Sequence, residues 1–315
     1  MNILIRCDSS NIIGTGHVMR CLNYADYFPD DSFTFMCRTF PWNIISKIVE
    51  KGHKVIQMEY QVEPELKHYS TWIGVTRELE IADFKNLATG VYDKIIIDHY
   101  GIDAFIEKKI KSHFNCELIV ITDIYDFTHY CDTFINYTCQ DIEQARSINI
   151  NNETCFKIGY DNLILNKLFR EPASKKVYFR NKIKNIVITM GGCDPMNYTQ
   201  KIIDIISMYV KKNNINVKVI IGKSNINKIN TEYSVLNNIS YVEMINLYKE
   251  TDLVIGSCSI TAFERLILNV PQICLKIIEN LETINDVKLN ITTLPNLMNN
   301  IQKFSNSLTT PSPIH

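Results

Sequence analysis

The chain has 315 residues, 46% of them hydrophobic, which predicts about two domains with packed cores. Its formal net charge of −1 gives no broad attraction to nucleic acid or acidic membranes. The ten cysteines form no C-x-x-C pair, which argues against a structural zinc site. We find no signal-peptide pattern at the N-terminus and no apolar run of the roughly 18 residues that a membrane span needs. These features indicate a cytoplasmic protein with free thiols.

The chain opens with a predicted strand, a glycine turn and a helix. Residues 3–5 are apolar, Gly14 and Gly16 lie in the polar turn, and a helical pattern begins at His17. Such a unit brings backbone N–H groups and a helix N-terminus to the carboxyl end of a parallel strand, where α/β sheets bind ligands. The turn is not G-x-G-x-x-G, so it gives little support for a nicotinamide site. On geometry alone, a functional His17 and a His17 that merely starts the helix are equally favoured.

Further strands are predicted at residues 32–37, 53–58, 93–97 and 117–121. Asp98 and Tyr100 follow an isoleucine-rich strand and should lie at the ligand-facing edge of the sheet, whereas His99 is free to point away. The alternative is that Asp98 caps the helix that starts near Asp103.

The pattern changes over residues 163–184, which are charged and contain a proline, and we place an interdomain crossover there. A strand at 185–190 then leads into Gly191 and Gly192 and a helix at 199–210, which repeats the layout of the N-terminus. We therefore predict two Rossmann-like lobes, residues 1–162 and 185–298. Residues 299–315, rich in Asn, Ser and Thr, are predicted to be a flexible tail.

A second polar turn follows the predicted strand at 252–256. Ser257, Ser259 and Thr261 precede Glu264 at the start of a helix, where N–H groups and hydroxyls suit a diphosphate and a carboxylate can accept ribose hydroxyls. The T-x-x-E spacing is also typical of a capping box, which would occupy the carboxylate. The residues alone favour the capping box.

The motif D-S-S-x-x-I-G-x-G-H-x-x-R, residues 8–20, resembles the opening signature of the nucleotide-sugar hydrolases of pseudaminic acid biosynthesis. These enzymes release UDP from UDP-2,4-diacetamido-2,4,6-trideoxy-β-L-altropyranose. The family is similar in turn to the GT-B glycosyltransferase that attaches N-acetylglucosamine to lipid I. The D-H-Y-G at 98–101 and the turn at 257–264 also resemble family segments. The resemblance covers about residues 1–280, and it implies an α/β, GT-B-like fold of two Rossmann-like lobes with a cleft between them.

The resemblance also implies roles for individual residues. His17 would be the general base that activates water. Sugar-binding residues of the first lobe would be Asp8, Ser10, Gly14, Gly16, Arg20, Asp98 and Tyr100. Nucleotide-binding residues of the second lobe would be Gly191, Gly192, Ser257, Ser259, Thr261, Glu264 and Asn280. The chain departs from the family at Cys258 and Ser259, where the family has glycines that leave room for the phosphates.

We therefore predict hydrolysis of a UDP-linked deoxy amino sugar to free sugar and UDP, with inversion at the anomeric carbon. A UDP-sugar and water are the expected partners, and no metal, cofactor or nucleic acid is expected. The alternatives are a GT-B glycosyltransferase with a UDP-sugar donor and a non-catalytic nucleotide-sugar-binding homologue. The intact His17 favours an enzyme, whereas Cys258 favours the non-catalytic alternative.

Overall fold

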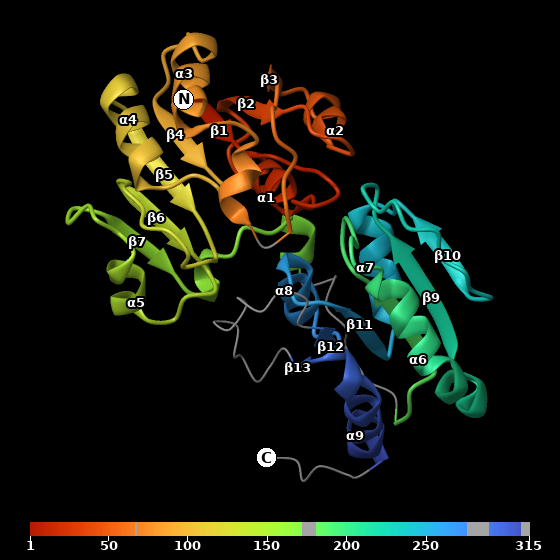
Figure 1. The fold of residues 1–315 in the computed structure, drawn as a ribbon. Helices are drawn as coiled ribbons and strands as arrows, with labels where there is room; N and C mark the ends of the chain where they lie inside the picture. Colours follow the sequence, from red (N-terminus) through yellow and green to blue (C-terminus); the bar gives the residue numbers. More distant parts are fainter. Residues whose placement is uncertain (67, 172–180, 276–289, 310–315) are drawn as a thin grey trace. The chain divides into compact units, whose positions relative to one another are not determined.

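The computed structural model describes residues 1–66, 68–171, 181–275 and 290–309, and it divides into two compact units, residues 1–164 and 165–315. Each unit contains one parallel sheet with helices on both faces (Figure 1). The predicted α/β class with two Rossmann-like lobes is therefore confirmed. Part of the segment predicted as a crossover belongs to the second unit, because Phe169 of the 3-10 helix η3 (Lys167–Arg170) lies in the core of that unit.

The first unit, unit 1, has a seven-stranded sheet in the order β3-β2-β1-β4-β5-β6-β7. Its strands are β1 (Asn2–Arg6), β2 (Ser32–Arg38), β3 (Lys54–Met58), β4 (Lys94–Ile97), β5 (Glu117–Ile121), β6 (Thr133–Asn136) and β7 (Cys155–Ile158). Its helices are α1 (Gly16–Asp26), α2 (Ile45–Glu50), η1 (Tyr69–Ile73), α3 (Arg77–Leu87), α4 (Ala104–Phe114), α5 (Ile142–Ser147) and η2 (Tyr160–Asn162). The strand order reverses between β1 and β4, and α/β sheets bind ligands at such a reversal.

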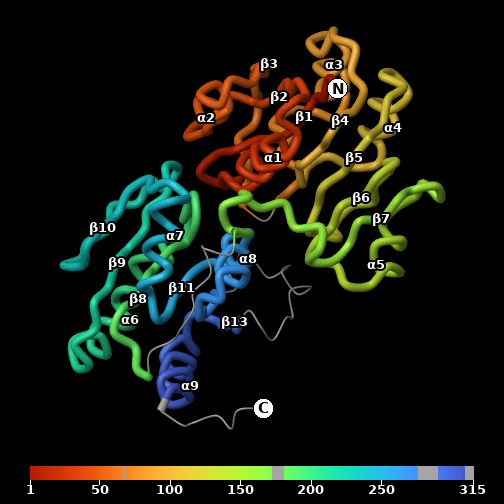
Figure 2. The backbone as a smooth tube through the Cα atoms, turned by 180° about the vertical axis from the view of Figure 1, so that it is seen from behind, coloured from red at the N-terminus to blue at the C-terminus, as the bar shows by residue number. Residues whose placement is uncertain are grey.

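Two apolar layers hold unit 1 together. On one face, Ile3 and Ile5 of β1 pack with Val18 and Leu22 of α1. On the other face, Ile95 and Ile97 of β4, with β1 and β5 residues, pack against α3 and α4. Figure 2 shows α3 and α4 running along β4 and β5. The central strands are buried on both faces, so their side chains are apolar on both sides.

The second unit, unit 2, has a six-stranded sheet in the order β10-β9-β8-β11-β12-β13. Its strands are β8 (Asn185–Thr189), β9 (Asn216–Ile221), β10 (Ser234–Asn237), β11 (Leu253–Ser257), β12 (Gln272–Leu275) and β13 (Ile291–Thr292). Its helices, besides η3, are α6 (Tyr198–Asn213), α7 (Tyr241–Glu250), α8 (Ile260–Ile267), η7 (Leu294–Asn296) and α9 (Leu297–Thr309). The strand order reverses between β8 and β11, which places their following turns side by side.

The predicted flexible tail is wrong for the residues that the structure describes there. Residues 297–309 form α9, in which Leu297 and Ile301 are fully buried against the sheet and Phe304 packs beside them. The high content of Asn and Ser concealed an apolar stripe at helical spacing, which supplies enough buried surface to order the helix. The last residues, 310–315, lie outside the described part.

Candidate functional site

His17 and Asp98 meet at the strand-order reversal of unit 1. His17 is the second residue of α1, and Asp98 directly follows β4. The Nδ1–H of His17 donates to Oδ1 of Asp98 at 2.6 Å. This bond fixes the orientation and tautomer of the imidazole, which leaves Nε2 as the nitrogen able to accept a proton. His17 is buried, with 5% of its surface exposed.

Arg20, one turn further along α1, binds the same carboxylate with two hydrogen bonds. Its Nε donates to Oδ2 of Asp98 at 2.7 Å and its Nη2 to Oδ1 at 2.6 Å. Burial alone would raise the pKa of the Asp98 carboxyl, but the Arg20 guanidinium and His17 hold that pKa well below its usual range. Asp98 is therefore ionised near neutral pH. It does not cap the next helix, because Asp103 caps α4.

Aromatic side chains surround the His17 imidazole. The Tyr100 ring lies edge-on to it with centroids 4.5 Å apart, and the Trp72 ring lies at 6.1 Å. Tyr100 and Trp72 stack on each other at 5.5 Å. The sequence analysis did not select Trp72, because η1 has neither strand nor helix periodicity to place it. Figure 1 shows the short helix between β3 and α3 from which this residue comes.

Asp123 and Tyr137 complete the cluster and were also missed. Tyr100 donates its hydroxyl to Oδ1 of Asp123, and Tyr137 donates to Oδ2 at 2.9 Å. Arg20 donates from Nη1 to the Tyr137 hydroxyl at 2.6 Å. Asp123 follows β5 and Tyr137 follows β6, so their place at the carboxyl edge of the sheet was the available signal.

Asp8 lies in a separate, fully buried network, which corrects its expected place beside the sugar. Its Oδ1 lies 2.8 Å from Nη1 of Arg6 and accepts from the backbone N–H of Arg38 at 2.7 Å. Its Oδ2 lies 3.1 Å from Nε2 of His99. With both oxygens occupied and no exposed surface, Asp8 anchors the turn that carries His17.

Ser10 and Gly14 also shape this turn from within. The Ser10 hydroxyl accepts from the backbone N–H groups of Ile12 and Ile13, at 3.1 and 2.9 Å. Ser10 and Gly14 exchange two backbone hydrogen bonds. Gly16 begins α1, and a Cβ atom at this position would meet nothing within 4 Å. Gly16 therefore has open space beside it.

In unit 2, two helix N-termini follow the neighbouring strands β8 and β11. A side chain binds the backbone N–H groups at one of them and not at the other. The Asp194 carboxylate accepts from the N–H groups of Tyr198 and Thr199 at 2.8 and 2.7 Å, so it fills the N-terminus of α6. Ser259, the N-cap of α8, makes no side-chain capping bond. An anion that binds at a helix N-terminus of this pair would therefore bind at α8.

Three hydroxyls line the turn before α8. Oγ of Ser257 lies 2.9 Å from Oγ of Ser259, which lies 3.1 Å from Oγ1 of Thr261. Gly191, in the turn with Gly192, has φ of 86°, and a Cβ atom there would lie 3.7 Å from the Ser257 hydroxyl. The glycine turn after β8 thus lies against these hydroxyls, and the structure brings together the predicted nucleotide residues of both turns.

Glu264 does not form the capping box that the T-x-x-E spacing suggested. The N-cap of α8 is Ser259, two residues before Thr261, and no capping bond is present. Oε2 of Glu264 is buried without a hydrogen-bond partner among the described residues. Burial raises the pKa of Glu264 to about 8, although the positive charge of Arg265 by itself would lower it. A buried carboxyl oxygen without a partner costs free energy, and such a group is typical of a residue that binds a ligand. Asn280 lies outside the described residues.

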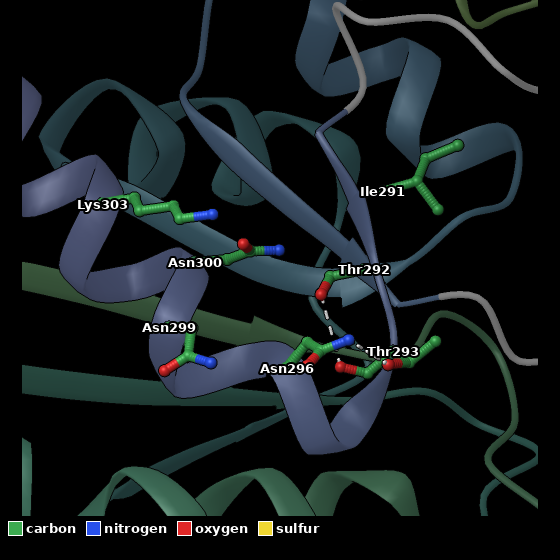
Figure 3. A pocket seen from close by; sticks show the side chains of 7 residues that line it. All are labelled: Ile291, Thr292, Thr293, Asn296, Asn299, Asn300 and Lys303. Atoms are coloured by element: carbon green, nitrogen blue, oxygen red, sulfur yellow. Dashed lines mark hydrogen bonds between the residues drawn. The ribbon is translucent and has the colours of Figure 1, made fainter.

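A polar pocket of about 430 Å³ lies elsewhere in unit 2, between β13 and α9. Figure 3 shows its lining side chains, among them Thr292 of β13 and Asn300 and Lys303 of α9. None of the predicted site residues lines it. Within the described ranges, no three His, Cys, Asp or Glu side chains are grouped to hold a metal ion. Those ranges also contain no helix of the length and apolarity that a membrane crossing requires.

Two parallel α/β units in one chain, and the solved structures that superpose on it, identify the fold as GT-B-like. Arabidopsis thaliana UGT89C1, solved with quercetin, superposes with a TM-score of 0.63 at 10% identity, covering 99% of this chain and 90% of that one. The glycotransferase of kitacinnamycin superposes with a TM-score of 0.60 at 8% identity, covering 99% and 91%. Identities this low establish the fold alone.

Sequence relatives confirm the resemblance that the motifs predict. The chain is 26% identical over 284 residues to the UDP-2,4-diacetamido-2,4,6-trideoxy-β-L-altropyranose hydrolase of Campylobacter jejuni, covering 87% of this chain and 92% of that protein. It is 22% identical over 297 residues to the spore coat polysaccharide biosynthesis protein SpsG of Bacillus subtilis, covering 89% and 78%.

A third relative is an uncharacterized protein of Methanocaldococcus jannaschii, 27% identical over 293 residues. The match covers 87% of this chain but only 55% of that protein, so the chain spans about half of its length. No protein-family model matches the chain.

Proposed function

We propose that this protein hydrolyses a UDP-linked deoxy amino sugar to the free sugar and UDP, as a step of nonulosonic (pseudaminic-type) acid biosynthesis. The comparisons support an enzyme that acts on nucleotide sugars: one relative is named as a UDP-sugar hydrolase and another as a polysaccharide biosynthesis protein. The observation that carries the hydrolytic step is the bond of 2.6 Å between His17 and Asp98.

In the proposed reaction, Nε2 of His17 takes a proton from water. The water oxygen attacks the anomeric carbon on the face opposite UDP, and the bond between this carbon and the UDP oxygen breaks. Asp98 stays ionised, accepts from Nδ1–H and stabilises the imidazolium that forms. The sugar emerges with inverted configuration, and UDP leaves as an anion.

Unit 2 would stabilise that anion. The N-terminus of α8, which no described side chain caps, and the Ser257 hydroxyl would supply donors to the diphosphate, and Glu264 would accept from the ribose hydroxyls. Because UDP is a good leaving group, the reaction needs no second carboxylic acid. In this respect it differs from ordinary glycosidases.

The burial of His17 favours water over a larger acceptor. Its side chain is 6% exposed and lies against the Tyr100 and Trp72 rings, so the base reaches a small nucleophile more readily than a sugar or lipid hydroxyl. On this observation we rank hydrolysis above glycosyl transfer.

The test is to incubate the protein with a panel of UDP-sugars in ¹⁸O-labelled water and to analyse both products by mass spectrometry and NMR. We expect the label on the anomeric oxygen of the sugar, none in UDP, and an inverted anomer as the first product. UDP release that requires an added alcohol acceptor would instead establish a transferase. Nucleotide binding without any release would establish a non-catalytic homologue.

A further inference from the structure

Unit 2 contains a buried arginine that forms no ion pair with a carboxylate of the described residues. Arg265 follows Glu264 on α8 and has no exposed surface. The other fully buried arginines differ, because Arg6 and Arg38 both form ion pairs with Glu80. Among the residues that the structure describes, no carboxylate lies within ion-pair distance of Arg265.

The Arg265 guanidinium instead uses neutral partners. Nε donates to the Gln272 side chain at 2.6 Å, Nη2 to the backbone oxygen of Ser257 at 3.0 Å, and Nη1 to Oγ1 of Thr261 at 3.1 Å. The last two bonds hold the two ends of the turn before α8. Gly256 makes room for this arrangement, because a Cβ atom there would lie 3.3 Å from Nη1 and 2.5 Å from the Thr189 oxygen.

Three titratable groups face Arg265, and two of them are largely uncharged near neutral pH. Glu264 has its pKa raised to about 8 by burial, and burial also raises the pKa of Tyr248. The third is Cys274, whose sulfur accepts from Nη2 of Arg265 at 3.7 Å. A hydrogen bond from Cys258 and the charge of Arg265 lower the pKa of Cys274 to about 7, although burial by itself would raise it. A buried cation with so little compensating charge favours an anion nearby.

Arg265 contacts one end of a chain of three hydroxyls. A guanidinium only donates, so Oγ1 of Thr261 accepts from Arg265. In the contacts between Thr261 and Ser259 and between Ser259 and Ser257, either oxygen can be the donor. The Arg265 bond occupies one lone pair of the Thr261 oxygen and so favours the direction in which Thr261 donates to Ser259 and Ser259 donates to Ser257. In that direction the Ser257 O–H is left for an anionic ligand.

We propose that Arg265 is a positioning residue for the diphosphate: it orients the Thr261–Ser259–Ser257 hydroxyl chain so that the Ser257 O–H donates to a phosphate oxygen. The inference rests on the proposed function, because it takes UDP as the ligand of unit 2. No described side chain caps the N-terminus of α8 or binds the buried Oε2 of Glu264, and these two observations are independent signs of a ligand at this turn. Arg265 acts through the hydroxyls and through its charge, since it is itself shielded from solvent.

The test compares the affinities of UDP and uridine by titration calorimetry. The ratio of the uridine to the UDP dissociation constant measures the contribution of the phosphates. We expect Arg265→Met to lower this ratio by about tenfold or more, because at least one charge-assisted hydrogen bond is lost. The affinity for uridine should change less than about twofold. Arg265→Lys keeps the charge but not the fork of donors, so it should give an intermediate ratio.

Thr261→Val breaks the hydroxyl chain and leaves Arg265 in place, so it tests the proposal even if the Arg265 variants fail to fold. The matched control is Arg146→Met on α5, where an exposed arginine pairs with Glu143. Thermal melting verifies that each variant is folded. An unchanged ratio in folded Arg265→Met and Thr261→Val would overturn the role of Arg265 while leaving the proposed function intact. A wild-type protein that binds neither UDP nor uridine would overturn both.

Discussion

At the scale of single residues, one carboxylate organises the proposed catalytic group. Asp98 accepts from both His17 and Arg20, so its negative charge is already balanced by the guanidinium. The imidazole is therefore oriented by Asp98 without facing an uncompensated charge. Asp123 is a second carboxylate of the same cluster. It accepts from the Tyr100 hydroxyl, and its Oδ2 lies 3.5 Å from Nη1 of Arg20.

Replacing the proposed base should separate catalysis from binding. We expect His17→Asn to lower the rate of UDP release by about 10²–10⁴-fold, the usual contribution of a general base. The dissociation constant of UDP should stay the same, because the proposed nucleotide-binding residues lie in unit 2. Steady-state kinetics and calorimetry measure the two effects, with the exposed His113→Asn as control. Wild-type turnover in His17→Asn would exclude the proposed role.

Glu264 should matter for nucleoside binding. Two ribose hydroxyls that donate to Glu264 would favour its ionised form in the complex, and a carboxylate that accepts them makes charge-assisted hydrogen bonds worth roughly 1.5–3 kcal/mol each. Glu264→Ala should therefore weaken the binding of both UDP and uridine by at least about tenfold. This result differs from that expected for Arg265→Met, which leaves uridine affinity nearly intact. Unchanged affinities for both ligands would show that Glu264 does not contact the ribose.

The same residue makes the stability of unit 2 depend on pH. The pKa of Glu264 is about 8 in the folded protein and 4.5 in the reference state, so the folded state binds more protons between these values. Its contribution to the free energy of unfolding therefore falls as pH rises through this window. Glu264→Gln removes the titration. Relative to wild type it should gain stability by up to about 1.4 kcal/mol for each pH unit in this range.

Denaturant unfolding of both proteins at several pH values from 5 to 8 measures this difference, with the exposed Glu250→Gln on α7 as control. A stability difference between Glu264→Gln and wild type that stays constant over these pH values would contradict the raised pKa.

At the scale of elements, the two helix N-termini of unit 2 show how one local feature decides the place of an anion site. Asp194 fills the N-terminus of α6, whereas Ser259 leaves that of α8 open. Both helices follow a parallel strand at the same sheet edge, so position alone does not distinguish them. The difference lies in one carboxylate, which competes with any bound phosphate for the same N–H groups.

Helix α9 should contribute measurably to the stability of unit 2. Ile301 is fully buried in the core, so Ile301→Ala should lower the free energy of unfolding by about 2–5 kcal/mol, the usual cost of such a cavity. The neighbouring Gln302 is exposed, and Gln302→Ala should have little effect. Thermal and denaturant unfolding compare the two variants. Equal stability of Ile301→Ala and Gln302→Ala would contradict the packing of α9 on the sheet.

At the scale of the whole molecule, the proposed chemistry uses side chains of both units and is expected to need no metal ion. In the proposal, the N-terminus of α8 and nearby hydroxyls stabilise the leaving diphosphate in place of a metal. We expect UDP release to be unchanged by EDTA and by added magnesium or manganese. Loss of activity in EDTA that magnesium or manganese restores would contradict this expectation.

The sequence by itself determined the elements and their edges. Apolar runs followed by glycine turns predicted the strands β1 and β8, and the polar residues after each strand, such as His17 and Asp98, were correctly placed at one edge of the sheet. This worked because the carboxyl ends of parallel strands are fixed by the direction of the chain. The motif at residues 8–20 also resembled the hydrolases to which one of the relatives found by the comparisons belongs.

Only the tertiary structure decided which of these polar groups face each other. Asp8 and Asp98 both follow buried strands, yet Asp8 is enclosed by Arg6 and His99 while Asp98 binds His17. The partners of a side chain come from distant parts of the chain, and their packing leaves no periodic signal in the sequence. For the same reason the sequence could not show that, among the described residues, Oε2 of Glu264 has no hydrogen-bond partner and Arg265 is buried with no carboxylate beside it.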